Sequence, residues 1–284
     1  MRRIKIKHVT RYEYSRPVKL LTHKLHIRPR EGHDIRIETS QLGISPDFTI
    51  QWQRDIYGNS VALVAFSRDD RTLNIASEVI VQHYEDQPLQ FLVSESASRF
   101  PFYYDAMEQV DLFPYQTAVF PQESPAVREW LTAIHRPGTK IFTADLLDNL
   151  NRKIANDFDY VVREQPGVQT PLETIRLLSG SCRDFSTLFI EACRALGLAS
   201  RFVSGYLFQG ASGEQHQATH AWSEVYLPGA GWRGFDSTSG NRVGGDHIAV
   251  AHHRHPEAIP PVSGSFLGHL ENPNMSVEVR VTLL

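Results

Sequence analysis

The 284-residue sequence predicts an α+β protein, with an N-terminal antiparallel β-sandwich followed by helices packed on an antiparallel sheet. Three observations lead to this prediction. Apolar and polar residues alternate through most of residues 2–83, which indicates strands. Residues 126–196 carry apolar residues at steps of three and four, which indicates helices. Alternation returns in residues 202–236, where short segments are separated by turn residues.

Composition excludes several classes of protein. The net charge of −3 argues against a general nucleic-acid binder. No stretch approaches the ~20 apolar residues of a membrane span, and residues 1–8 lack the apolar run of a signal peptide. Two cysteines in so long a chain do not form a disulfide framework and fit a reducing compartment. We therefore expect a cytoplasmic protein with no nucleic-acid or membrane partner, and its oligomeric state stays open.

The first third of the chain predicts the sandwich. Short alternating segments are separated by turn signals at Gly32, Pro46, Gly58 and Asp69, a spacing typical of antiparallel β-domains. The basic residues near the N-terminus alternate with isoleucines, so they form the solvated face of a strand. Nothing in this region resembles an active site.

The middle of the chain predicts a domain boundary. Residues 84–124 contain recurrent prolines and many aromatic residues, which we interpret as a long surface connector. We therefore assign residues 1–95 to the β-sandwich domain and residues 96–284 to a second domain.

Helices and a meander of strands follow the connector. Apolar spacing predicts helices over 126–134 and 144–158, and a third that opens at Thr170 with Pro171 in its first turn. After Gly197 the chain alternates again. Segments 202–208, 219–227 and 232–236 predict three antiparallel strands packed on the helix that precedes them.

That preceding helix begins at the corner Gly180–Phe185. Ser181 and Asp184 have the spacing of a helix cap, and the apolar face starts at Phe185. Cys182 therefore occupies the first helical position. A thiol at a helix N-terminus ionises more easily, because the unpaired N–H groups and the helix dipole favour negative charge. The alternative is a small buried cysteine, which is common.

The second cysteine, Cys193, lies eleven residues further along the same predicted helix. At ~1.5 Å rise per residue the two cysteines are roughly 16 Å apart. A disulfide needs Cα atoms within ~7 Å, so this pair cannot form one. We interpret Cys193 as core packing.

His220 and Asp236 fall on neighbouring strands of the predicted meander. His220 follows Cys182 by 38 residues, and Asp236 follows His220 by 16 residues. Neighbouring strands can bring two side chains within a few ångströms. Thiol acyl transfer needs a thiolate, an imidazole that carries the proton, and a carboxylate or amide that holds the imidazole. Each residue alone has an ordinary structural explanation, but the three together predict a Cys-His-Asp triad.

Three sequence blocks resemble the transglutaminase-like superfamily. They are Gly180-Ser181-Cys182-Arg183-Asp184-Phe185, His220-Ala221-Trp222-Ser223-Glu224-Val225-Tyr226 and Trp232-Arg233-Gly234-Phe235-Asp236-Ser237-Thr238. Further resemblance is to the bacterial branch of putative cysteine proteases with an N-terminal β-domain. It is carried by Thr10–Tyr14, Pro17-Val18, Ile27-Arg28-Pro29-Arg30, Asp55-Ile56-Tyr57-Gly58-Asn59 and Asp246-His247-Ile248-Ala249-Val250-Ala251.

The resemblance implies a papain-like, transglutaminase-like catalytic core and no cofactor. It implies a nucleophile at Cys182, a base at His220 and an orienting carboxylate at Asp236. The backbone N–H of Cys182 would be one oxyanion donor. Three side chains are candidates for the second donor: Gln116, Trp130 and Tyr160. The third block carries Ser237 where proline more often follows the aspartate, and Asp184 matches the family block but is sufficiently explained as a helix cap.

The C-terminal region raises a metal hypothesis. Histidines at 247, 252, 253 and 255 are close in sequence, but their spacing fits no standard zinc motif. We therefore assign no metal ligands. Residues 275–284 alternate again and predict a closing strand that could join either sheet.

We expect thiol-dependent acyl transfer on a peptide or protein substrate through a Cys182 thioester. Hydrolysis, as in a cysteine peptidase or amidase, is favoured because water is always available and because of the branch that the sequence resembles. Two alternatives stay open. One is a protein-glutamine transglutaminase with an amine acceptor, and the other is a catalytically idle peptide-binding module.

Overall fold

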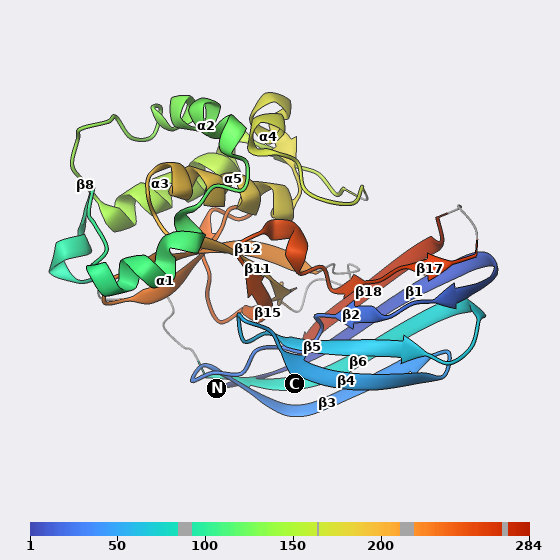
Figure 1. The fold of residues 1–284 in the computed structure, drawn as a ribbon. Helices are drawn as coiled ribbons and strands as arrows, with labels where there is room; N and C mark the ends of the chain where they lie inside the picture. The colour runs from blue at the N-terminus through green and yellow to red at the C-terminus, as the bar shows by residue number, and fades with distance from the viewer. Residues whose placement is uncertain (85–92, 164, 211–218, 269–271) are drawn as a thin grey trace.

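The computed structural model describes residues 1–84, 93–163, 165–210, 219–268 and 272–284. Long strands occupy one part of the molecule, and the helices gather on the far side of a second sheet (Figure 1). The fold is the predicted α+β class. None of the helices in the described residues is long and apolar enough to span a membrane.

The N-terminal region forms two antiparallel sheets. The first has the order β17-β1-β6-β3 with β18 also on β1, and the second has the order β16-β2-β5-β4. The N-terminal strands are β1 (Arg2–Leu20), β2 (His23–Leu25), β3 (Ile35–Ser45), β4 (Phe48–Arg54), β5 (Ser60–Phe66) and β6 (Asp70–His83). Buried side chains from both sheets, among them Leu25, Val64 and Leu73, share one apolar cluster, as a sandwich requires.

The end of the chain returns to these sheets. Strand β18 (Asn274–Leu283) pairs with β1, and the short strands β16 (Val262–Ser263) and β17 (Phe266–Leu267) pair with β2 and β1. The N–H of Leu284 donates to the carbonyl of Arg3 at 2.8 Å, so the two termini lie together (Figure 1). The closing strand thus joins the N-terminal sheet rather than the sheet of the second half.

The second half contains the helices and a five-stranded antiparallel sheet of order β14-β13-β12-β11-β15. Its helices are α1 (Ala106–Gln116), α2 (Ser124–Leu131), α3 (Thr143–Asp157), α4 (Pro171–Leu177) and α5 (Cys182–Ala195). Its strands are β11 (Ser200–Leu207), β12 (His220–Leu227), β13 (Gly231–Asp236), β14 (Asn241–Arg242) and β15 (His247–His253). Short pairs β7 (Arg99–Phe100) with β8 (Ile141–Phe142) and β9 (Asp159–Tyr160) with β10 (Ser179–Gly180) lie outside this sheet.

Helix α1 corrects the expectation of an irregular connector over residues 84–124, of which residues 85–92 lie outside the described residues. Asp105 caps the helix: its Oδ1 accepts hydrogen bonds from the N–H groups of Met107 and Glu108 at 2.9 and 2.8 Å. Pro114 lies inside the helix, near its end. Proline density misled the sequence interpretation because the cap, and not the proline, determined where the helix formed.

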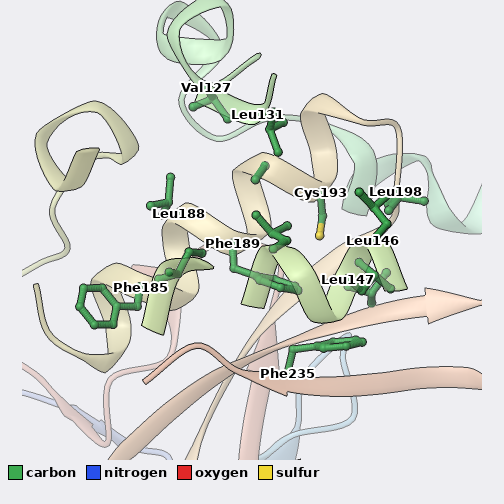
Figure 2. Close-up of a cluster of buried hydrophobic side chains, with 14 of the residues drawn as sticks. Val127, Leu131, Leu146, Leu147, Phe185, Leu188, Phe189, Cys193, Leu198 and Phe235 are labelled. Atoms are coloured by element: carbon green, nitrogen blue, oxygen red, sulfur yellow. The ribbon is translucent and has the colours of Figure 1, made fainter. Parts of the chain in front are cut away.

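Helix α5 runs through the centre of the second half. Its apolar face, with Leu188, Phe189 and Cys193, points toward side chains of α2, α3 and β13 (Figure 2). Phe189 stacks on Phe235 with ring centroids 5.4 Å apart. Cys193 is fully buried, and burial raises the pKa of its thiol, which agrees with a packing role.

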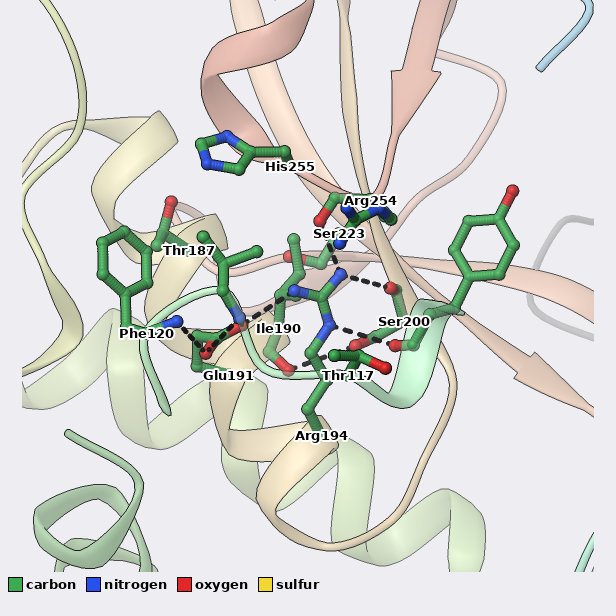
Figure 3. Close-up of polar contacts among 12 residues, drawn as sticks. Thr117, Phe120, Thr187, Ile190, Glu191, Arg194, Ser200, Ser223, Arg254 and His255 are labelled. Carbon is green, nitrogen blue, oxygen red and sulfur yellow. Dashed lines mark hydrogen bonds and ion pairs between the residues drawn. The ribbon is translucent and has the colours of Figure 1, made fainter. Parts of the chain in front are cut away.

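The far end of α5 is held by a buried ion pair between Glu191 and Arg194 (Figure 3). Glu191 also accepts hydrogen bonds from the N–H groups of Val119 and Phe120 in the segment between α1 and α2. Arg194 donates to the carbonyl of Ser200 at the start of β11. These contacts fix α5 relative to the strands that follow it.

The two halves share a core. Ile4 and Ile6 of β1 belong to the same buried cluster as Phe202 and Tyr206 of β11. Nδ1 of His8 lies 2.9 Å from the hydroxyl of Tyr206, which satisfies both buried polar groups. The sandwich therefore supports one face of the five-stranded sheet of the second half.

Candidate active site

Cys182 is the first residue of α5, as the sequence predicted. Asp184 accepts hydrogen bonds from the backbone N–H and the hydroxyl of Ser181, at 2.8 and 2.7 Å. This cap holds the turn before the helix in place. Because the first N–H groups of a helix have no partner within it, the corner favours negative charge near Cys182.

Asp184 has further partners that make it a structural centre of this corner. It is fully buried and accepts from Nη1 of Arg163 at 2.8 Å and from the N–H of Gln169 at 2.7 Å. The segments before α4 and before α5 are thereby tied together. All of the oxygen contacts of Asp184 are structural, which agrees with the expected capping role.

The residue before the cap must be glycine. A Cβ on Gly180 would lie 2.9 Å from Cβ of Asp184 and 3.0 Å from Oε1 of Gln169. Gly180 also pairs with Tyr160 in the two-stranded parallel element of β9 and β10, and its carbonyl accepts from the N–H of Val161 at 2.9 Å. The close backbone approach places Tyr160 beside the start of α5.

His220 and Asp236 meet where β12 begins and β13 ends. Nε2 of His220 donates to Oδ2 of Asp236 at 3.0 Å. The Asp236 side chain is 1% exposed, and that of His220 is 11% exposed. The bond is therefore shielded from water, and it leaves Nδ1 of His220 for a different partner.

Cys182 lies within hydrogen-bonding reach of His220, which joins the three predicted residues. Burial by itself would lower the pKa of His220. Hydrogen bonds to Asp236 and Cys182, together with their negative charges, outweigh burial and raise it above its ordinary value. The imidazole is thus disposed to exist as an imidazolium beside the sulfur.

Asp236 is held as a carboxylate. Burial would raise its pKa, but hydrogen bonds from His220 and His247, together with the positive charge of the His220 imidazolium, hold the pKa well below its usual range. Its other oxygen, Oδ1, accepts from the N–H of Thr238 at 2.9 Å. The carboxylate is therefore fixed at both oxygens.

His247, at the start of β15, is a neighbour of the triad that the sequence interpretation did not assign to it. Its Nε2 lies 3.2 Å from the same Oδ2 of Asp236, and its side chain is 8% exposed. Its ring packs edge-on against Trp222 with centroids 5.2 Å apart. The only sequence signals were its place in the Asp246-His247 block and in the C-terminal histidines.

The three candidate oxyanion donors have different places in the fold. Gln116 donates to the carbonyl of Gly197 at 2.6 Å, at the end of α5 opposite Cys182. Trp130 packs on Phe158 in the helical core. Tyr160 is half exposed, and burial and the charges of Cys182 and Asp236 raise the pKa of its phenol, so it stays a hydrogen-bond donor.

One group among the described residues has the composition of a metal site. The candidate ligand atoms of His220, Asp236 and His247 lie within 4.8 Å of one another. The N–H of Gly244, however, donates to Nδ1 of His247 at 3.3 Å, so the proton of this ring is on Nε2. A histidine that binds a metal through Nε2 presents the lone pair of that atom and carries its proton on Nδ1, which is the opposite arrangement.

The other C-terminal histidines do not join His247. His252 and His253 pack against Tyr57 of the sandwich, with ring centroids 6.1 and 4.3 Å away. His255 accepts at Nδ1 from the N–H of Glu257. Closeness along β15 therefore did not produce a cluster in space, because strand residues diverge to different faces and neighbours.

Two sequence profiles match separate parts of the chain. The bacterial transglutaminase-like N-terminal region matches residues 4–82, and the transglutaminase-like superfamily core matches residues 132–237. The chain belongs to the transglutaminase-like superfamily. The second match includes Cys182, His220 and Asp236, and the first covers most of the sandwich.

Relatives of this superfamily member align along its full length. An uncharacterized protein of Mycobacterium tuberculosis is 28% identical, over 98% of this chain and 92% of its own. One of Mycobacterium leprae is 21% identical over the whole of both chains. The crystal structure of a putative cysteine protease from Cytophaga hutchinsonii superposes with a TM-score of 0.73 at 20% identity, over 99% of this chain and 90% of that one.

These comparisons have different weight. The likeness to the Cytophaga structure establishes the fold. Members of the superfamily are generally enzymes, and membership supports a thiol-dependent activity in this transglutaminase-like protein.

Proposed function

We propose that this protein is a thiol-dependent hydrolase of peptide or amide bonds that works through a thioester at Cys182. The observation that carries the proposal is the position of His220. Its Nε2 donates to buried Asp236, and Cys182 lies within hydrogen-bonding reach of the same ring. A thiol, an imidazole and a carboxylate in this order are the groups that acyl transfer requires.

The first half-reaction forms the thioester. His220 takes the thiol proton, and Sγ of Cys182 attacks the carbonyl carbon of the substrate. The negative charge that develops on the carbonyl oxygen is stabilised by the backbone N–H of Cys182 and by the hydroxyl of Tyr160. His220 then gives its proton to the leaving amine as the C–N bond breaks.

The second half-reaction releases the acyl group. His220 takes a proton from water, and the hydroxide oxygen attacks the thioester carbonyl. The C–S bond breaks, and the Cys182 sulfur recovers a proton from His220. Asp236 keeps the ring oriented in both half-reactions.

The test asks whether the protein acts on peptide substrates and whether water or an amine accepts the acyl group. Purified protein and its Cys182→Ala variant are incubated with a proteome-derived peptide mixture and with a glutamine-containing protein, with and without a labelled primary amine. New N-termini or carboxylates from wild type only are the expected result. Label incorporation with ammonia release would instead make the protein a transglutaminase.

A substrate-independent readout completes this test. Alkylation of Cys182 by iodoacetamide, located by mass spectrometry, measures whether the sulfur is activated by His220. Buried Cys193 is the internal control, since it should stay unmodified in the folded protein. If Cys182 reacts no faster than an ordinary thiol and no substrate turns over, the idle binding module is the correct interpretation.

A further inference from the structure

We infer that His247 is a positioning residue for the triad. It holds Asp236 in place by donating a second hydrogen bond to Oδ2, the same oxygen that accepts from His220. This inference rests on the proposed function, because it concerns the same site. Nε2 of His220 and Nε2 of His247 lie 3.0 and 3.2 Å from one atom, Oδ2 of Asp236. The site is thus a Cys-His-Asp triad with an additional histidine behind the carboxylate.

The backbone prepares His247 as a donor. Gly244 contacts it twice: its N–H donates to Nδ1 of His247 at 3.3 Å, and its carbonyl accepts the His247 N–H at 2.9 Å. Because Nδ1 is an acceptor here, Nε2 carries the proton in the neutral ring. His247 therefore donates to Asp236 without needing a positive charge.

Packing fixes the direction of that donor. The ring of His247 meets Trp222 edge-on, and Trp222 is itself 1% exposed. His247 also begins β15, which pairs with β11 through Leu207. The side chain is therefore held by the sheet and not by a surface loop, so its hydrogen bond to Asp236 has a constant geometry.

The second donor has two consequences for the triad. It completes the shell of the buried carboxylate, whose Oδ1 is occupied by the N–H of Thr238. It also draws negative charge away from the bond to His220. A less basic Asp236 lets His220 release its proton to the leaving group more readily, which benefits the general-acid step.

His247 is the group that can act as the second donor to Asp236. The titratable groups that act on His220 and Asp236 from neighbouring elements are Cys182 of α5, Tyr160 of β9 and His247 of β15. Cys182 contacts His220, and Tyr160 lies beside the start of α5. Apart from His220, only His247 among these groups hydrogen-bonds to the carboxylate of Asp236.

Two variants separate the hydrogen bond from the packing. His247→Phe retains a ring against Trp222 but has no donor, and His247→Gln has an amide donor but no ring. We expect His247→Phe to lower the turnover number about tenfold with KM unchanged, the range for one hydrogen bond to a charged group. We expect His247→Gln to restore it to within about threefold of wild type, with both variants folded by circular dichroism.

The pH profile of Cys182 alkylation provides the decisive readout, and it needs no substrate. Loss of the second donor leaves Asp236 more negative, so His220 stays protonated to higher pH in His247→Phe. In His247→Phe the alkaline limb of the profile should therefore shift to higher pH, by up to about one pH unit. In His247→Gln it should lie at the wild-type position. An unmoved or lowered limb, or equal loss in both variants, overturns the inference.

These outcomes are distinct from failure of the proposed function. If wild type shows an activated Cys182 but no hydrolysis, the alkylation profile still tests His247. If wild-type Cys182 is not activated by His220, the proposed function fails first, and the role of His247 fails with it.

Discussion

The hydroxyl of Ser237 donates a hydrogen bond to Oδ1 of Asn151, 2.8 Å away, and joins the residue after Asp236 to helix α3. Nδ2 of Asn151 donates in turn to the carbonyl of Asn241 at 2.9 Å. Both side chains are buried. Ser237 thus fixes the turn that carries the Asp236 carboxylate.

Ser237→Ala should destabilise the fold by about 1–2 kcal/mol, because it leaves Oδ1 of Asn151 buried without its donor. Urea unfolding monitored by tryptophan fluorescence measures the change. Ser239→Ala, at a less buried serine of the same turn, is the control and should cost less than about 0.5 kcal/mol. Equal effects of the two substitutions would contradict the importance of the contact to α3.

Tyr160→Phe tests the second oxyanion donor. If the phenol stabilises the developing charge, the turnover number should fall about 10²-fold while KM changes little. Gln116→Ala is the matched control, since Gln116 binds the carbonyl of Gly197 at the other end of α5, and its turnover should equal that of wild type. A normal rate for Tyr160→Phe would assign the second donor elsewhere.

The ion pair of His220 and Asp236 predicts a pH dependence of stability. The folded-state pKa of His220 is raised, so its contribution is complete below pH ~6.5 and is lost as pH rises through the raised value. The folded-state pKa of Asp236 is lowered, so its contribution is present above pH ~3.9 and is lost as pH falls through the lowered value.

The difference in melting temperature between wild type and His220→Gln should therefore be greatest between about pH 4 and 6.5 and should shrink toward alkaline pH. Calorimetry at several pH values measures it. The double variant His220→Gln, Asp236→Asn provides the baseline without either charge. A difference that grows above pH 7 would contradict the assigned pair.

Asp184→Ala tests the helix cap beside Cys182. Removal of the carboxylate leaves Arg163 and the N–H groups of Ser181 and Gln169 without their acceptor, which should cost about 3–5 kcal/mol. Asp157→Ala removes an acid from the exposed pair with Lys153 and should cost less than about 1 kcal/mol. Comparable losses would mean that Asp184 is not a structural centre.

Local pattern predicted most of the elements and nominated Cys182, His220 and Asp236 as candidate site residues. The spacing of apolar residues located α5, and the predicted strands over 219–227 and 232–236 match β12 and β13 closely. Capping residues at Ser181 and Asp184 placed Cys182 at the first helical position. These features depend on residues near one another in the chain, so the sequence alone was sufficient to predict them.

Tertiary structure decided what local pattern could not. The sequence left the closing strand between two sheets, but its backbone groups pair with β1. In the sequence, His247 is one of several C-terminal histidines. The register of β15 places it beside Asp236, whereas His252 and His253 lie at the other end of that strand. Likewise, only packing separates Tyr160, next to Cys182, from Gln116 at the other end of the same helix. Each of these depends on which distant segments come together, and that is determined by burial over the whole chain rather than by the residues of one element.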